Sequence, residues 1–188
     1  FGFVGILADP RINTVLMGPG AGVGEKTVEL VQQAGVKKCN MVLDADVLAS
    51  FVGRAGQLEA IADGDVVITP HEGEFAKLFP SLDIEKDRIS AARSAAKLTN
   101  TTVVLKGVST LVASPDGRVS ISSNGPSWLA VGGTGDVLAG IIGGLIAQGM
   151  PAFEAASAAV WIHGEAGMKA GRGLIASDLL DRIPSVLP

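Results

Sequence analysis

Residues 65–106 contain the run DVVITP (65–70), then IEKDRISAARSAAKL (84–98), then TVVLK (102–106), and this succession decides the fold class. The first and last runs are short, apolar and rich in β-branched residues, which is typical of buried strands. The middle run places Ile89, Ala92 and Ala96 at helical spacing. A strand, a helix and a strand in this order predict two parallel strands joined by a right-handed crossover.

The same alternation continues toward both ends of the chain. Four more runs are expected to be strands: Thr14–Gly18, Met41–Asp44, Thr110–Ala113 and Arg118–Ile121. The last two are joined by Ser114-Pro115-Asp116-Gly117, a turn sequence, and therefore predict a β-hairpin. Further helices are expected over Lys26–Ala34, Asp136–Gln148, Ala152–Lys169 and a short last segment capped by Ser177-Asp178.

These elements predict a three-layer α/β fold with a mostly parallel central sheet, helices on both faces and a small β-hairpin. In open sheets of this kind, ligands bind outside the carboxyl ends of the strands. Residues that directly follow a strand are therefore the first candidates for a functional site.

Composition limits the class of protein. The 188 residues, 47% of them hydrophobic, suit one globular domain over residues 1–188. The net charge of −4, with scattered basic residues, argues against a nucleic-acid partner. The single cysteine, Cys39, excludes an internal disulfide framework and is compatible with the cytoplasm, where we expect the protein. The longest apolar run, Val137–Ala147, is too short to cross a bilayer, so no membrane partner is expected.

The beginning of the chain shows no secretory signal. It also lacks an initiating Met, and its first strand follows an irregular opening. We expect that an N-terminal part of a longer protein precedes residue 1.

Two groups of residues follow the first two predicted strands. The glycine run Gly18–Gly24 matches neither a dinucleotide fingerprint nor a P-loop, and it is interpreted either as a tight turn or as backbone that approaches a ligand closely. Asp44 and Asp46 could hold magnesium-bound phosphate or cap the next helix. Their spacing favours capping.

Two more candidates follow the third and fourth strands. Pro70 stops the third strand, and the residues after it can begin a helix in which Glu72 and Glu74 suit the first turn. His71 is either a surface residue or a substrate contact, and its position at the strand end favours the contact. Lys106-Gly107-Val108-Ser109-Thr110 can hold phosphate or ribose oxygens, or can simply turn into the next strand.

The sharpest motif is Gly132-Gly133-Thr134-Gly135-Asp136, which leads directly into an apolar helix. We expect the amides of Gly133, Thr134 and Gly135 to be uncovered and to form an anion cradle at the positive end of the helix dipole. Asp136 adds a carboxylate beside that cradle. Such a pair suits phosphoryl transfer, in which the donors stabilise the transferring group and the carboxylate accepts the acceptor hydroxyl's proton.

His163 is expected to be a hydrogen-bonded packing residue on a long helix. With two histidines and no suitably placed partners, the sequence predicts no zinc site and no other dedicated metal cage.

Together, five ordered motifs resemble the ADP-dependent NAD(P)H-hydrate dehydratases, which have a ribokinase-like fold. The motifs are Gly18–Gly22, Asp44–Leu48, Thr69–Glu74, Lys106–Thr110 and Gly133–Asp136. The likeness extends in order from about Thr14 to the C-terminus. It implies that the chain is the C-terminal two-thirds of a ribokinase-like domain that lacks its N-terminal part.

The resemblance implies a repair activity on the S epimer of hydrated NADH or NADPH (NADHX or NADPHX). ADP would give its terminal phosphoryl group to the hydrate hydroxyl, and phosphate would then be eliminated. The family pattern assigns Asp136 as the catalytic base and places Gly22, His71 and Asp136 against the hydrate. It also assigns nucleotide binding to a set of six residues: Lys106, Gly107, Val108, Ser109, Thr110 and Gly135.

The resemblance further implies Mg²⁺ bound mainly by phosphates and water, a homo-oligomer, and an N-terminal NAD(P)H-hydrate epimerase domain in the full-length protein. Two departures from the family pattern stand out: Glu72 where proline is usual, and Pro126–Val131 where an Asn-Pro-Gly-Met-Ala-Thr stretch is common. Two alternatives stay open, namely a small-molecule kinase of the same superfamily and an inactive nucleotide-binding fragment.

Overall fold

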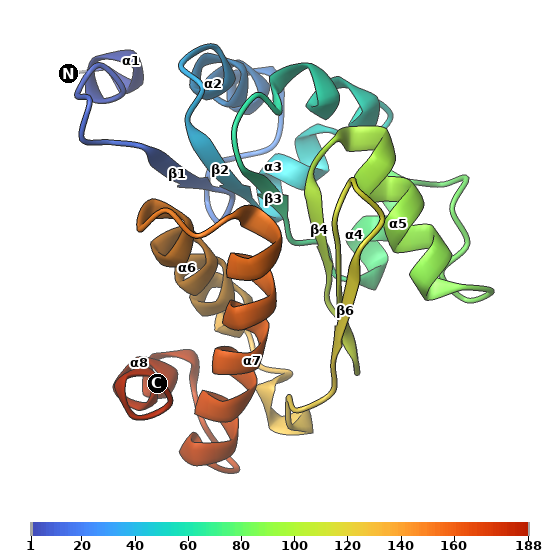
Figure 1. Ribbon diagram of the computed structural model, residues 1–188, viewed down its shortest axis with the longest axis vertical. Coiled ribbons are helices and arrows are strands. Elements are labelled where there is room, and N and C mark those ends of the chain that lie inside the picture. Colours follow the sequence, from blue (N-terminus) through green and yellow to red (C-terminus); the bar gives the residue numbers. More distant parts are fainter. Residues whose placement is uncertain (1, 188) are drawn as a thin grey trace.

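The fold is built on one six-stranded sheet, seen in the computed structural model, which describes residues 2–187 (Figure 1). The strands are β1 (Thr14–Met17), β2 (Asn40–Leu43), β3 (Val66–Ile68), β4 (Thr102–Leu105), β5 (Thr110–Ala113) and β6 (Val119–Ser122). Spatial order follows chain order. Strands β1 to β4 pair in parallel, whereas β5 and β6 complete the sheet as an antiparallel hairpin. The predicted mostly parallel sheet with a hairpin is confirmed.

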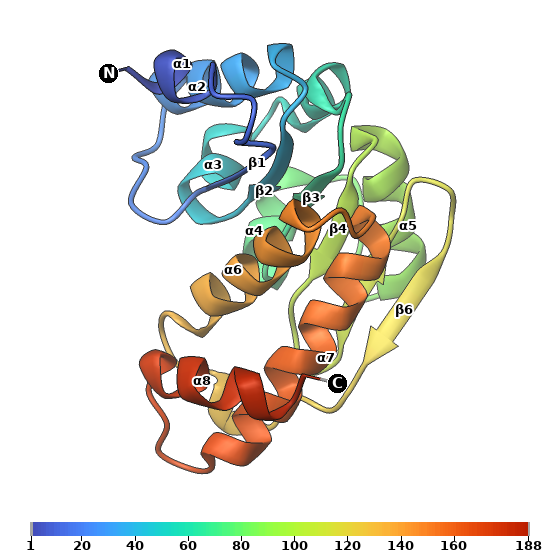
Figure 2. The same cartoon turned by 60° about the vertical axis from the view of Figure 1, so that its left-hand side comes forward.

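Helices cover both faces of this sheet, as Figures 1 and 2 show. The α-helices are α1 (Phe3–Ile6), α2 (Glu25–Val36), α3 (Ala45–Ser50), α4 (Glu72–Leu78), α5 (Arg88–Thr99), α6 (Thr134–Ala147), α7 (Ala152–Ala170) and α8 (Ala176–Arg182). Short 3₁₀ turns are η1 (Ala55–Ile61), η2 (Ser127–Leu129) and η3 (Ile183–Ser185). Helices α6 and α7 lie on one face, and α2 to α5 lie on the other.

Two of the three hydrophobic clusters lie on opposite faces of the sheet, because successive side chains of a strand point to opposite sides. In β2, Met41 and Leu43 belong to the core under α2 to α5, and Val42 belongs to the core under α6 and α7. In β4, Leu105 belongs to the core under α2 to α5, and Val104 belongs to the core under α6 and α7. A strand buried on both faces has no polar face, which explains the continuous apolar runs in the sequence.

Four helix starts differ from the expected ones, and that of α2 differs by a single residue, Glu25 in place of Lys26. Helix α5 begins at Arg88, not Ile84, because the Asp87 side chain accepts a hydrogen bond from the Ser90 amide at 3.0 Å and so caps it. Helix α6 begins at Thr134, two residues earlier than expected. Helix α8 begins at Ala176, so Ser177 lies inside it, whereas Asp178 Oδ2 accepts a hydrogen bond from the Ile175 amide at 2.8 Å and helps to cap the helix as expected.

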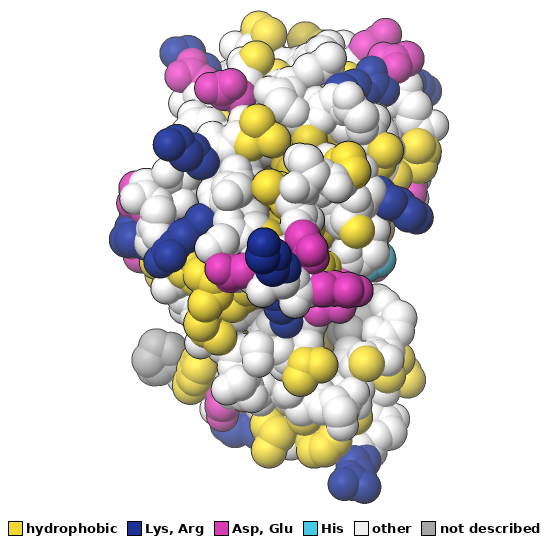
Figure 3. All heavy atoms as spheres, turned by 90° about the vertical axis from the view of Figure 1, so that its right-hand side faces the viewer, with side chains coloured by type: hydrophobic (Ala, Val, Ile, Leu, Met, Phe, Trp, Pro, Cys, Tyr) yellow, Lys and Arg dark blue, Asp and Glu magenta, His cyan; other side chains and the backbone are white. Residues whose placement is uncertain are grey.

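Surface charge is mixed in sign. On the face that Figure 3 shows, acidic and basic side chains lie interspersed among polar and apolar ones. Within residues 2–187, every helix falls short of the length and apolarity that crossing a membrane requires.

Candidate functional site

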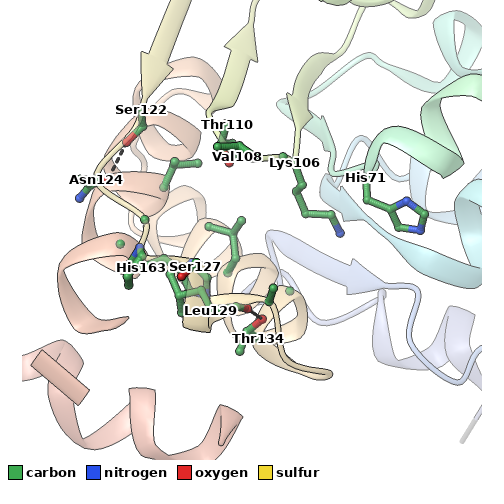
Figure 4. A pocket seen from close by; sticks show the side chains of 18 of the residues that line it. His71, Lys106, Val108, Thr110, Ser122, Asn124, Ser127, Leu129, Thr134 and His163 are labelled. Atoms are coloured by element: carbon green, nitrogen blue, oxygen red, sulfur yellow. Dashed lines mark hydrogen bonds between the residues drawn. The ribbon is translucent and has the colours of Figure 1, made fainter. Parts of the chain in front are cut away.

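A cavity of about 970 Å³ lies beside the carboxyl ends of β3 and β4, and Figure 4 shows side chains that line it. It is bounded by the loop after β4, by α6, by α7 and by the segment after β6. In Figure 4, His71 and Lys106 lie at one end, and Ser122, Asn124 and His163 lie at the other. Of the predicted site residues, the cavity brings together His71, Lys106, Gly107, Val108, Thr110, Thr134 and Gly135. Its location agrees with the rule for ligand sites in open α/β sheets.

The charged end of the cavity is organised by Lys106, which directly follows β4. Its Nζ donates a hydrogen bond to Asp44 Oδ1 at 3.1 Å, and the Asp44 side chain is only 3% exposed. Asp44 Oδ1 also accepts from the Ala45 amide at 2.9 Å, so it caps α3 as the spacing predicts. A Cβ built on Gly135 would lie 3.5 Å from Lys106 Nζ. The ammonium group is therefore held beside the first turn of α6.

The first turn of α6 supplies fewer free amides than the sequence predicts. The Thr134 amide donates to the Val131 carbonyl at 3.3 Å, and the buried Thr134 hydroxyl contacts the Leu129 and Val131 carbonyls, each at 2.8 Å. The expectation of an uncovered amide at Thr134 is therefore wrong. The amides of Gly133 and Gly135 have no hydrogen-bond acceptor among the described residues. Gly133 has a φ of +87°, a conformation that favours glycine.

Asp136 lies exposed in the same turn, just outside the cavity lining. Its amide is used within the turn, donating to the Gly133 carbonyl at 3.1 Å. Its carboxylate forms no hydrogen bond or ion pair with any residue from 2 to 187, so it stays available to a ligand.

Gly22 lies on the loop between β1 and α2, away from the cavity lining. Its amide donates to Asp46 Oδ2 at 2.9 Å, and its carbonyl accepts from Thr27 Oγ1 at 2.5 Å. Both carboxylates of the Asp44–Asp46 pair are thus engaged by the protein, Asp44 by Lys106 and Asp46 by this loop. The start of this loop passes close to the end of β2. A Cβ at Gly18 would lie 2.3 Å from the Asp44 carbonyl oxygen, so a side chain at this position would collide with the backbone.

His71 is the N-cap of α4. Its Nδ1 accepts hydrogen bonds from the amides of Gly73 at 3.0 Å and Glu74 at 3.3 Å, and Glu74 Oε2 accepts from the His71 amide at 2.9 Å. The imidazole is 60% exposed and contributes to the cavity wall. His71 also lies beside Lys106, because the two residues form an isolated parallel bridge.

Glu72 forms an ion pair with Arg88. Glu72 Oε1 lies 3.2 Å from Arg88 Nη2. This pair covers Gly107, since a Cβ there would be 2.5 Å from Arg88 Nη2. Only glycine fits at position 107 unless the ion pair moves.

Most residues of the loop Lys106–Thr110 line the cavity. Val108 is 94% exposed and Thr110 starts β5, and both contribute to the wall. Ser109 does not belong to the lining.

His163 forms part of the far end of the cavity. The pKa of its imidazole is lowered to about 4, mainly by burial, with a smaller contribution from the charge of Lys106, while a hydrogen bond with the Thr134 backbone acts in the opposite direction. Its Nε2 is buried without a hydrogen-bond partner among the described residues. The burial agrees with the expected packing role, but Nε2 makes no hydrogen bond among the described residues, and the ring is neutral at pH 7.

Several lining residues of the far end escaped the sequence interpretation, notably Ser122, Asn124, Leu129 and Gly164. The spacing of Gly164 and Gly167 on the long helix α7 could have indicated this end of the cavity from the sequence. A Cβ on Gly164 would lie 2.6 Å from the Asn124 side chain, and one on Gly167 would lie 2.7 Å from Leu129 Cγ. Two glycines three residues apart on a helix thus mark where another segment packs closely.

Within residues 2–187, no three histidine, cysteine or acidic side chains gather in a way that would hold a metal ion.

Comparison with known proteins matches residues 4–188 to a family model described as NAD(P)H-hydrate dehydratase. An ADP-dependent (S)-NAD(P)H-hydrate dehydratase from Neisseria meningitidis is 38% identical over 180 residues, which cover 92% of this chain and 60% of that protein. A bifunctional NAD(P)H-hydrate repair enzyme from Gloeobacter violaceus is 44% identical over 159 residues, 84% of this chain and 30% of that protein. The chain thus spans less than two thirds of the length of these relatives.

Solved structures show the same likeness. An ADP/ATP-dependent NAD(P)H-hydrate dehydratase from Bacillus subtilis, co-crystallised with ATP and Mg²⁺, has a TM-score of 0.83 and 30% identity over 97% of this chain and 68% of that one. A ribokinase-like superfamily protein from Enterococcus faecalis, 24% identical, has a TM-score of 0.79 over 97% of this chain and 64% of that one. The predicted ribokinase-like fold is confirmed.

Proposed function

The chain belongs to the NAD(P)H-hydrate dehydratase family, and we propose that it carries out the ADP-dependent dehydration of the S epimer of hydrated NADH or NADPH. One observation carries the proposal: Lys106 Nζ is held by buried Asp44 at 3.1 Å, beside the glycine-rich start of α6 and at one end of the large cavity. An ammonium group, a free glycine amide and a helix N-terminus together favour an anion at that point.

The polarity of the cavity supports one orientation of the nucleotide. Lys106 and His71 lie at one end, whereas Leu129, Leu138 and Val160 contribute apolar wall elsewhere in the lining. Phosphates are charged and a nucleobase is largely apolar, so the phosphates of ADP would lie toward Lys106 and the base toward the apolar wall. Val108, with its exposed side chain on the Lys106–Thr110 loop, would gain a contact when the base binds.

In the first proposed step, the hydrate hydroxyl attacks the terminal phosphorus of ADP. The bond from that phosphorus to the bridging oxygen breaks, AMP leaves with the electron pair, and Asp136 accepts the hydroxyl proton. The Lys106 ammonium and the Gly135 amide stabilise the negative charge of the transferring group. Positioning does most of the work in such a step, so the exposed carboxylate of Asp136 does not need to be a strong base.

In the second proposed step, the C–O bond of the phosphorylated hydrate breaks and phosphate leaves with the electron pair. Loss of a proton from the neighbouring ring carbon then forms the double bond of the dihydronicotinamide. The net change converts hydrate and ADP into the reduced cofactor, AMP, phosphate and a proton.

Mg²⁺ fits this site as a partner of the phosphates, because Asp44 and Asp46 are already engaged by Lys106 and Gly22. Asp136 is the one carboxylate of the predicted site that stays available to it. When bound, the ion would neutralise part of the phosphate charge. The co-crystal of the Bacillus subtilis relative with ATP and Mg²⁺ supports this part of the proposal. The expected epimerase domain stays a prediction, supported by the relative named bifunctional.

Product analysis tests the function. Hydrated NADH, ADP and Mg²⁺ are mixed with the chain, and reduced nicotinamide absorbance, AMP and phosphate are followed together. We expect all three to rise in equal amounts. A stable phosphorylated product without recovery of the reduced cofactor would instead indicate a small-molecule kinase, and ADP binding without turnover would indicate a binding fragment.

A further inference from the structure

We propose that capping of α4 locks the neutral imidazole of His71 as its Nε2–H tautomer, so that His71 serves the substrate as a hydrogen-bond donor and never as its proton acceptor. This inference rests on the proposed function for the identity of the substrate. The tautomer of the neutral imidazole follows from the capping contacts alone.

Two backbone donors fix the assignment. Nδ1 lies 3.0 Å from the Gly73 amide and 3.3 Å from the Glu74 amide, and both N–H groups point toward it. A nitrogen that accepts a hydrogen bond needs its lone pair and carries no proton. In a neutral imidazole the other nitrogen then holds the proton. Turning the ring over would place a carbon against both amides and lose both hydrogen bonds.

Nε2 is left free for a ligand. The nearest carboxylate oxygen, Glu74 Oε2, lies 3.6 Å away, beyond hydrogen-bond distance, and already accepts from the His71 amide at 2.9 Å. The ring is mostly exposed, lines the cavity and adjoins Lys106. An N–H group in this place can donate to an oxygen of the hydrate without carrying a full charge.

The donor role divides the chemistry between two residues. Proton acceptance at Nδ1 would put an N–H group against the amides of Gly73 and Glu74 and would remove the cap. Nε2 already carries its proton. Asp136 is therefore the group of this site that takes the proton of the hydrate hydroxyl, and His71 holds and polarises an acceptor oxygen, as a neutral histidine at a helix N-terminus can.

The tautomer is measured directly by long-range ¹H–¹⁵N correlation of protein labelled with ¹⁵N-histidine. The chain has two histidines, so a His163→Gln variant assigns the remaining signals to His71. We expect the neutral imidazole of His71 to have a bare Nδ1 and a protonated Nε2. A protonated Nδ1, or a shift averaged between the two tautomers, would overturn the proposal.

The donor role is tested with two variants of His71. Asparagine is a good N-cap but is too short to replace Nε2–H, whereas alanine removes both functions. We expect His71→Asn to melt close to the wild type and His71→Ala to melt a few degrees lower. Both should lower kcat/KM for the hydrate by about ten- to hundredfold while leaving the KM for ADP unchanged.

A His71→Asn variant with wild-type kcat/KM would show that Nε2–H makes no substrate contact and would contradict the donor role. The NMR measurement needs no substrate, so it decides the tautomer even if the wild-type chain fails to dehydrate the hydrate. Failure of the proposed function and failure of this inference are thus distinguishable.

Discussion

Asp136 and Lys106 illustrate how two charged residues at one strand edge differ in role. Lys106 is half-buried and tied to Asp44, and it keeps one position. Asp136 is exposed and has no partner within the described residues. A fixed cation suits the binding of phosphate, and a free carboxylate suits a group that must approach a hydroxyl.

Replacing Asp136 should separate these roles. We expect Asp136→Asn to keep its affinity for ADP and to lose about a hundredfold or more in kcat, because a positioned proton acceptor is removed. Steady-state kinetics and calorimetric titration of ADP give the two numbers. Near-normal kcat would remove Asp136 from the proposed mechanism.

His163 makes stability depend on pH. Its pKa falls from the ordinary 6.5 to about 4 in the folded chain, mainly through burial. The unfolded state therefore binds a proton between these values and the folded state does not. Stability due to this residue is complete above pH 6.5 and is lost as pH falls toward 4, by about 3 kcal/mol in all.

Urea unfolding of the wild type and of His163→Gln at a series of pH values measures this contribution. Carboxylates titrate in both proteins, so the difference between the two curves isolates His163. We expect that difference to change between pH 6.5 and 4 and to be flat above pH 7. A constant difference across the whole range would mean that the imidazole titrates normally.

At the scale of elements, helix α7 shapes the far end of the cavity through its glycines. Gly167 faces Leu129, and the Leu129 carbonyl in turn accepts a hydrogen bond from the Thr134 hydroxyl at 2.8 Å. The packing of α7 against η2 thus reaches the first residue of α6. A change in that packing should therefore weaken the binding of ADP at the proposed nucleotide site.

Gly167→Ala and Gly144→Ala form a matched pair. A methyl group at 167 would press on Leu129, and we expect a loss of about 1–2 kcal/mol of unfolding free energy, together with weaker ADP binding. A Cβ at 144 would have nothing within 4 Å, so the better helix propensity of alanine should add about 0.5–1 kcal/mol. Denaturant unfolding and ADP titration of both variants check this. Equal stability of the two would contradict the close packing.

At the scale of the whole molecule, the parallel sheet and its hairpin were predictable because both depend on local patterns. Strands such as Val103–Leu105 are apolar without interruption, and Ser114–Gly117 is a strong turn sequence. Helix starts were less predictable, because Asp87 and His71 act as caps through hydrogen bonds that spacing does not determine.

The site was predictable at the strand ends and less so elsewhere. Lys106 and His71 meet because parallel strands bring their carboxyl ends to one edge. Asn124 and His163 line the same end of the cavity because the segment after β6 packs on α7, where Asn124 Nδ2 donates to the Trp161 carbonyl, a long-range contact. The hydrogen bond from the Thr134 amide to the Val131 carbonyl depends on the backbone conformation of residues 129–133, which no local motif determines.

In the proposed function, Lys106 and the start of α6 hold the transferring phosphoryl group. A crystal structure of the chain with a non-hydrolysable ADP analogue and Mg²⁺ would show whether they do. We expect the terminal phosphate to lie within hydrogen-bond distance of Lys106 Nζ and of the Gly135 amide, with the Asp136 carboxylate facing it. Phosphates at another edge of the sheet, or a Gly135 amide bonded to protein, would contradict this expectation.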